Sequence, residues 1–146
     1  MTDQQDLPPP SELGTKEYWD NQYETEKKNF DEVGDKGEVW YGEAAMNRMV
    51  RWIEKNIDSE SKIIDLGCGS GLMSIELYEA GFHNVDGVDY SENAIDLANK
   101  LAQDSDITDL NFFKCDILNP LQPELMNKYN VCVDKGTYDA IRFVHK

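Results

Sequence analysis

The sequence predicts an α/β domain, an open, Rossmann-like parallel sheet with helices on both faces and strand order 3-2-1-4. Short apolar segments alternate with longer segments of helical periodicity, which is typical of parallel sheets with right-handed crossovers. The first apolar segment, Ile63–Leu66, also runs directly into the glycine-rich turn Gly67-Cys68-Gly69-Ser70-Gly71. A strand, a glycine turn and a helix in this order form the nucleotide-binding corner of such sheets.

The expected elements follow the hydrophobic pattern along the chain. The expected strands are Lys62–Leu66, Asn84–Asp89, Asn111–Cys115 and Tyr129–Asp134. The expected helices are Lys16–Phe30, Glu43–Ile57, Leu72–Ala80, a helix after Ser91 that runs to about Gln103, and one short helix after Tyr138. Ser91 suits the N-cap of its helix, and Gly81 suits a left-handed C-terminal cap. The segment Asp31–Gly42 is expected to be a loop.

The N-terminal residues 1–14 are expected to form a disordered tail, because Pro8-Pro9-Pro10 and their polar neighbours can bury little apolar surface. The folded domain is then expected to span residues 15–146. No signal peptide opens the chain, and no apolar run approaches the ~20 residues of a membrane helix. We therefore expect a cytoplasmic protein that can also enter the nucleus.

Charge and cysteine content narrow the classes of partner. Acidic residues outnumber basic ones 29 to 14, and the formal charge of −15 disfavours nucleic acid and anionic membranes. The same charge suits a basic protein partner, although surface carboxylates can also serve solubility alone. The cysteines Cys68, Cys115 and Cys132 have no spacing typical of a disulfide framework or a metal site. We expect reduced, buried or half-buried thiols and no metal.

Four aspartates stand at the ends of the expected strands: Asp65, Asp89, Asp116 and Asp134. Because the C-terminal ends of parallel strands face one crevice, these carboxylates should gather there. Several carboxylates in a partly desolvated cleft repel a polyphosphate and favour a cation with hydroxyl donors. S-adenosylmethionine has a ribose diol, an ammonium and a sulfonium, and no phosphate. An NAD-type site is the alternative, but its third glycine would stand at position 72, which is Leu72.

The motif Asp65-Leu66-Gly67-Cys68-Gly69-Ser70-Gly71, with Asp89 and Asp116, resembles class I, seven-strand S-adenosylmethionine-dependent methyltransferases. Other segments resemble a narrower family, the elongation factor 1-alpha lysine methyltransferases. These segments are Leu13–Asp20, Val39–Glu43, Met46-Asn47-Arg48 and Asp134–Ile141. The resemblance implies a protein-lysine N-methyltransferase that uses S-adenosylmethionine and modifies a lysine of elongation factor 1-alpha.

The family fold continues through three further strands, so the resemblance implies a domain truncated at its C-terminus. The fourth strand, with Val131 and Val133, would then be an uncovered apolar edge that invites pairing with another chain. We expect a monomer with this edge open. A truncated, non-catalytic form that acts as a cofactor-binding or interaction module is the alternative function.

The resemblance also implies the cofactor contacts. Gly67, Gly69 and Gly71 would wrap the methionine part, Asp65 would hold its ammonium through water or the loop amides, and Asp89 would accept from both ribose hydroxyls. Asp116 would accept from the adenine amine, Ile117 would pack against the ring, and Tyr90 would line its slot. The alternatives are a plain tight turn for the glycines, backbone capping for Asp65 and Asp89, a loop role for Asp116 and a core role for Tyr90.

Methyl transfer requires mainly alignment, but a lysine acceptor must also lose its proton before it attacks. Asp134, beside the methyl group of the cofactor, is the candidate to orient the amine and to receive that proton through water. Tyr138 and Trp40 could wall the acceptor channel, with Trp40 also covering the cofactor. The alternative for Asp134 is a structural cap on the final helix. Trp19 and Tyr41 could also help to cover the cofactor, or Trp19 could instead simply anchor the first helix together with Tyr23.

Overall fold

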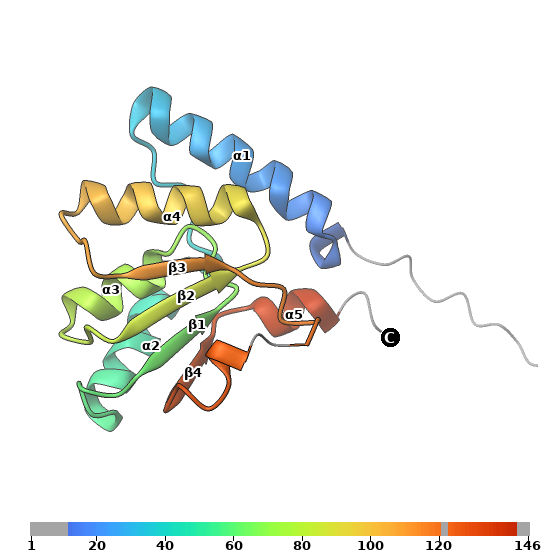
Figure 1. Ribbon diagram of the computed structural model, residues 1–146. Coiled ribbons are helices and arrows are strands. Elements are labelled where there is room, and N and C mark those ends of the chain that lie inside the picture. Colours follow the sequence, from blue (N-terminus) through green and yellow to red (C-terminus); the bar gives the residue numbers. More distant parts are fainter. Residues whose placement is uncertain (1–11, 121–122, 143–146) are drawn as a thin grey trace, which may run out of the picture.

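The computed structural model describes residues 12–120 and 123–142 and contains a four-stranded parallel sheet (Figure 1). The strands are β1 Ile63–Leu66, β2 Val85–Asp89, β3 Asn111–Lys114 and β4 Val131–Asp134. Their order is β3-β2-β1-β4, and all three neighbouring pairs are parallel. The predicted open parallel α/β sheet and its strand order are therefore confirmed.

Five α-helices and two 3-10 turns accompany the strands in the described residues. They are η1 Glu12–Gly14, α1 Lys16–Val33, α2 Gly42–Asn56, α3 Leu72–Glu79, α4 Glu92–Asp104, η2 Pro123–Leu125 and α5 Thr137–Arg142. The order strand, helix, strand from β1 to β3 places the carboxyl ends of these strands at one edge of the sheet. None of the described helices is long and apolar enough to span a bilayer.

The main core lies between one face of the sheet and the helices α2, α3 and α4. The strands contribute alternate residues to it, such as Ile63, Val85 and Phe112, as expected for a pleated strand. The helices contribute residues at helical spacing, among them Met46, Val50, Ile53, Leu77, Leu97 and Leu101. Leu77 and Leu97 are fully buried. This packing fixes the strand ends on which the site is built.

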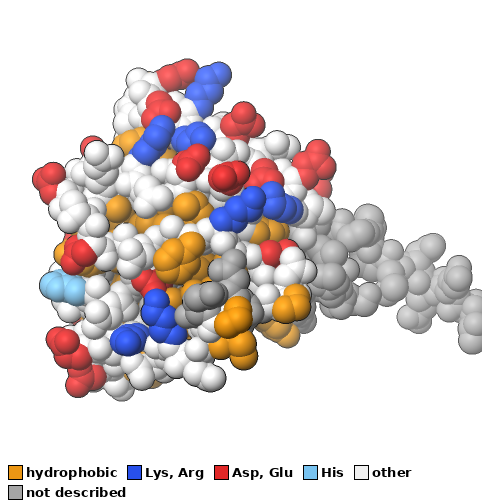
Figure 2. All heavy atoms as spheres, in the orientation of Figure 1, with side chains coloured by type: hydrophobic (Ala, Val, Ile, Leu, Met, Phe, Trp, Pro, Cys, Tyr) orange, Lys and Arg blue, Asp and Glu red, His pale blue; other side chains and the backbone are white. Residues whose placement is uncertain are grey.

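The opposite face of the sheet carries a smaller cluster centred on Ile64, Val88 and Cys115. The connection between β3 and β4 covers it with η2 and with Tyr129, whose hydroxyl donates to Asp86 Oδ2 at 2.6 Å. Among the described residues no α-helix packs in this cluster, since Pro120 and Pro123 interrupt the connection. Apolar side chains gather near the middle of the face seen in the space-filling view (Figure 2).

The helix ends follow the local sequence. Ser91 caps α4 as predicted, with its Oγ accepting from the amide of Ala94 at 3.3 Å. Gly81 follows α3 at φ +102°, in the predicted left-handed position. Helix α1 runs three residues beyond the predicted end at Phe30 and stops at Gly34, which has φ +72°.

Two expectations differ from the structure. The segment Glu12–Gly14, placed in the disordered tail, forms a 3-10 turn, because the Trp19 indole nitrogen donates to the Leu13 carbonyl at 2.7 Å. The proline triplet and the other residues 1–11 lie outside the described residues. The second difference is Cys132, which is exposed although we expected it to be at least half-buried. It lies on the edge strand β4, on the face opposite the main core.

Candidate cofactor and acceptor site

A cavity of about 210 Å³ opens at the carboxyl-terminal edge of the sheet. Its walls come from η1, α1, the segment before α2, the glycine turn, the residues after β2 and β3, and α5. The predicted residues that line it are Trp40, Asp65, Gly67, Gly69, Asp89, Tyr90, Asp116 and Ile117. The fold therefore brings together residues that are far apart in the sequence, as the strand-end argument predicted.

The glycine turn requires glycine for both conformation and space. Gly67, Gly69 and Gly71 have φ values of +62°, +54° and +79°, in the left-handed region. A Cβ at Gly67 would overlap Thr137, and one at Gly69 would overlap the Tyr23 hydroxyl. Gly71 differs from the other two, because it packs against Phe112 in the core and does not line the cavity. The tight-turn role is thus present at all three positions, and cofactor contact stays a prediction.

Asp65 is 2 % exposed and lies at the base of the cavity. Its Oδ2 accepts from the Ser74 hydroxyl at 2.8 Å, so its protein partner is a helix side chain and not a loop amide. Burial raises the pKa of Asp65 to about 7, against the opposing effects of the Ser74 bond and the positive charge of Lys135. A cation bound nearby would favour the charged form of this carboxyl.

Asp89 connects the glycine turn after β1 to the residues that follow β2. Its Oδ2 accepts from the amide of Gly69 at 3.0 Å, and its Oδ1 accepts from the amide of Ser91 at 2.9 Å. Burial raises the pKa of Asp89, while these backbone bonds oppose the rise. The capping alternative is therefore present in the structure, and the carboxylate also lines the cavity, where a ligand hydroxyl can reach it.

The residues beyond β2 and β3 form the far end of the cavity. Tyr90 is half-buried there, with Lys16 Nζ 5.9 Å from its ring centroid, and burial is the main cause that raises its pKa to about 12. Asp116 accepts from the Leu118 amide at 3.0 Å and from Asn119 Nδ2 at 3.1 Å. The loop role that we weighed for Asp116 is thus present, beside the half-buried Ile117.

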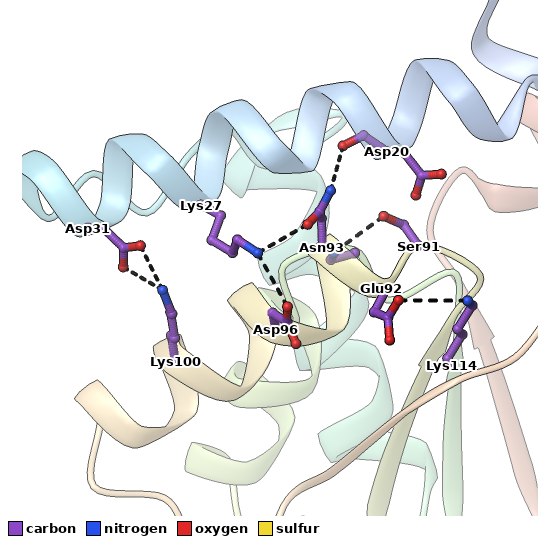
Figure 3. Close-up of polar contacts among 10 residues, drawn as sticks. Asp20, Lys27, Asp31, Ser91, Glu92, Asn93, Asp96, Lys100 and Lys114 are labelled. Atoms are coloured by element: carbon purple, nitrogen blue, oxygen red, sulfur yellow. Dashed lines mark hydrogen bonds and ion pairs between the residues drawn. The ribbon is translucent and has the colours of Figure 1, made fainter.

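Aromatic side chains from two segments cover the cavity. The Trp19 ring centroid lies 4.9 Å from that of Trp40 and 5.9 Å from that of Tyr23, and all three residues line the cavity. Trp19 therefore has the contacts of an anchor for α1 and also lines the cavity, and its covering of a cofactor stays a prediction. Helix α1 lies along α4, and polar contacts between the two helices hold it there (Figure 3).

Asp134 and Tyr138 do not line this cavity. Asp134 is exposed, and its oxygens accept from the amides of Thr137 at 2.8 Å and Tyr138 at 3.1 Å, so it caps α5. The Tyr138 side chain is 65 % exposed. A separate, open hollow beside Asp134 is lined by Tyr41 and Trp52, among others. The structure contains the capping alternative for Asp134, and the catalytic roles of both residues stay predictions.

Several residues without an assigned role also shape the site. Lys135 lies between the cavity and the open hollow, and its Nζ donates to the Trp40 carbonyl at 2.7 Å. Burial lowers the pKa of Lys135, and the negative charge of Asp65 opposes that shift. The Thr137 hydroxyl donates to the Leu66 carbonyl at 2.8 Å. Both residues stand in a motif singled out by resemblance, but their partners could not be known without the fold.

The charge of the cavity is strongly negative. Among the described lining residues, the acidic side chains are Glu26, Glu38, Asp65, Asp89 and Asp116, and the only lysine or arginine is Lys135. These carboxylates fit a ligand with positive charge and hydroxyl groups better than one with a diphosphate. Within residues 12–120 and 123–142, no group of three or more acidic, histidine or cysteine side chains could hold a metal ion.

A family model described as a methyltransferase domain matches residues 57–146, and the chain belongs to this methyltransferase family. It is 44% identical to EEF1A lysine methyltransferase 2 of Mus musculus over 133 residues, which cover 90% of this chain and 54% of the relative. It is 39% identical to the protein-lysine N-methyltransferase efm4 of Schizosaccharomyces pombe, covering 91% of this chain and 62% of the relative.

The fold agrees with solved methyltransferase structures. A crystal structure of a putative S-adenosyl-L-methionine-dependent methyltransferase from Methanococcus maripaludis matches with a TM-score of 0.60 at 16% identity. The match covers 86% of this chain and 58% of that chain. The chain spans 54% and 62% of the length of the two curated relatives above.

Proposed function

We propose that the chain is an S-adenosylmethionine-dependent protein-lysine N-methyltransferase and that its substrate is a lysine of elongation factor 1-alpha. The observation that carries the proposal is the cavity at the strand ends, whose acidic side chains repel phosphate groups. Asp89 is buried there, at the end of β2. The narrower substrate assignment is supported by the relatives named EEF1A lysine methyltransferase 2 in mouse and zebrafish, each 44% identical to this chain.

The lining residues fit the parts of S-adenosylmethionine in order. Asp89 would accept from the ribose hydroxyls, with the adenine between Tyr90 and Ile117 and its amine near Asp116. The methionine part would lie along the backbone at Gly67 and Gly69, where no Cβ stands in the way. When bound, the cofactor supplies a methyl group already activated on a sulfonium.

The chain itself contributes alignment and control of the acceptor proton. A lysine side chain has a pKa of ~10.4 in water, so the amine must be deprotonated before it attacks. Walls formed by Trp19 and Trp40 desolvate an entering amine and so favour its neutral form. Asp134, beside the open hollow next to Lys135, would receive the proton through water, and Tyr138 would contact the acceptor segment.

One observation favours a second function, a non-catalytic module that binds cofactor or a partner. The outer edge of β4 has no strand partner in the described part of the chain, and Cys132 is exposed on this strand. An open edge can pair with a strand of another protein. This function would use the same cavity without transferring a methyl group to lysine.

A methyl-transfer assay separates the two functions. The purified 146-residue chain is incubated with labelled S-adenosylmethionine and recombinant elongation factor 1-alpha. We expect label on a lysine of the substrate, loss of label with Asp89→Ala, and no label on a substrate whose lysines have been blocked chemically. Cofactor binding without transfer to lysine would reject the enzymatic proposal in favour of the module.

A further inference from the structure

Glu26 is a buried carboxylate with an unused oxygen. The residue is 9 % exposed, lies on α1 and lines the cavity. Its Oε1 accepts from Gln22 Nε2 at 3.1 Å, whereas Oε2 is buried and has no hydrogen-bond partner among the described residues. A buried carboxylate oxygen without a donor is costly, so this side chain requires an explanation.

The surroundings hold this carboxylate in one place. Gln22 binds it from one helical turn before, on the same face of α1. On another side, the backbone of Gly37 approaches so closely that a Cβ there would lie 2.7 Å from Glu26 Oε2. Glycine at this position, with φ +80°, lets the loop close against the carboxylate. The free oxygen therefore belongs to a side chain with little freedom to turn toward bulk water.

Glu26 lines the same cavity as the glycine turn. Tyr23, three residues earlier on the same face of α1, packs its hydroxyl against Gly69. A ligand that extends from Asp89 along the turn would therefore run along the side of the cavity that α1 forms. The short aminobutyrate chain of S-adenosylmethionine is the part that would follow this path.

No cation of the described chain satisfies Glu26. Lys135, the only lysine or arginine that lines the cavity in residues 12–120 and 123–142, donates to the Trp40 carbonyl and lies near Asp65. The neighbouring charges Glu38 and Asp35 are negative and, after burial, raise the pKa of Glu26. Asp65, by contrast, already has the Ser74 hydroxyl and the charge of Lys135. No described side chain donates to this oxygen, and a ligand can supply the missing donor.

We propose that Glu26 binds the α-ammonium group of S-adenosylmethionine directly, with Gln22 holding the carboxylate in place. This inference rests on the proposed function, which puts the aminobutyrate chain on the glycine turn. The ammonium carries three N–H donors and a positive charge, which match an ionised oxygen that has no partner. Asp65, the residue expected from the sequence to hold the ammonium, then acts on it through its charge alone.

The test compares two ligands on matched variants of the full chain. Calorimetry measures the binding of S-adenosylhomocysteine and of its des-amino analogue, which keeps the carboxylate and lacks only the α-amino group. The wild-type chain is expected to prefer S-adenosylhomocysteine by about tenfold or more, the range for a charge-assisted hydrogen bond. In Glu26→Gln this preference should largely disappear. Glu24→Gln, the same change at an exposed position of α1, should keep it.

Several outcomes overturn the inference. The Glu26→Gln variant could keep the full preference for the amino group, or bind S-adenosylhomocysteine more tightly than the wild type does. A wild-type chain that binds both ligands equally also overturns it, even if the variant fails to fold. A different result would reject the proposed function itself: a wild-type chain that binds neither ligand. In that case the inference fails with it.

Discussion

The contact between Gly67 and Thr137 shows how the glycine turn depends on a residue from the other end of the chain. Thr137 donates its hydroxyl to the Leu66 carbonyl and fills the space that a Cβ at position 67 would need. Gly67 also has a positive φ of +62°. Two separate costs, backbone strain and steric overlap, therefore oppose any side chain at this position.

We expect Gly67→Ala to lower the free energy of unfolding by about 3 kcal/mol, from about 1 kcal/mol of strain and about 2 kcal/mol of overpacking. Gly34→Ala is the matched control, because Gly34 has a similar φ of +72° but nothing within 4 Å of an added Cβ. In that variant the free energy of unfolding should fall only by the cost of the backbone strain. Urea denaturation of both variants measures the difference, and equal losses would contradict the overlap with Thr137.

Asp65 should make stability depend on pH. Its pKa is 3.8 in the reference state and about 7 in the folded chain. Between these values the folded chain keeps a proton that the unfolded chain has lost, so the free energy of unfolding falls as pH rises from about 4 to about 7. The slope from this one group is at most about 1.4 kcal/mol per pH unit.

Asp65→Asn removes this contribution and can keep the bond from Ser74. We expect the variant to be more stable than the wild type at about pH 8 and to lose that advantage toward about pH 4. Chemical denaturation at a series of pH values provides the comparison. Stability curves of the two proteins that run parallel from about pH 4 to pH 8 would show that Asp65 titrates normally in the folded chain.

At the scale of elements, helix α1 is attached to α4 by polar side chains that the sequence pattern could not pair. Lys27 contacts Asp96 at 3.3 Å and Asn93 at 3.1 Å, and Lys100 contacts Asp31 at 2.6 Å (Figure 3). These partners are more than 60 residues apart, so periodicity predicted each helix but not their contact. Each such exposed pair contributes at most about 1 kcal/mol.

We expect the double variant Lys27→Ala/Lys100→Ala to loosen α1 while the sheet stays intact. Hydrogen exchange should become faster in α1 and stay unchanged in β1 and β2, because the main core does not depend on these pairs. Lys28→Ala/Lys55→Ala is the control, since both lysines are exposed. Unchanged exchange in α1 of the first variant would mean that its other contacts, such as the packing of Tyr23 and Phe30 against the main core, are enough to hold the helix.

The acceptor side of the site shows what the sequence left open at this scale. Asp134 stands at a strand end like the other aspartates, but the turn through Gly136 brings the amides of Thr137 and Tyr138 back onto it. The same turn directs Lys135 to the Trp40 carbonyl. Local backbone geometry, which no hydrophobic pattern encodes, thus decides which side chain of this motif enters the cavity.

For the whole molecule, the strand order and the place of the cavity followed from the sequence because they depend on patterns that a sequence contains. Alternating apolar segments gave the parallel sheet, and strand-end aspartates with a glycine turn marked its ligand-binding edge. The sequence left open whether α1 covers the cavity or only anchors itself, and the place of Glu26 in this wall could not be predicted. Both depend on how a charged helix docks across the finished sheet.

The central claim is that the acidic cavity accepts a positively charged adenosine derivative without phosphate. The most direct measurement is calorimetric titration of the chain and of Asp89→Asn with S-adenosylmethionine and with NAD⁺. We predict that S-adenosylmethionine binds, that Asp89→Asn weakens this binding by about tenfold or more, and that NAD⁺ does not bind. Binding of NAD⁺ at least as tight as that of S-adenosylmethionine, or equal S-adenosylmethionine affinity in both proteins, would contradict the claim.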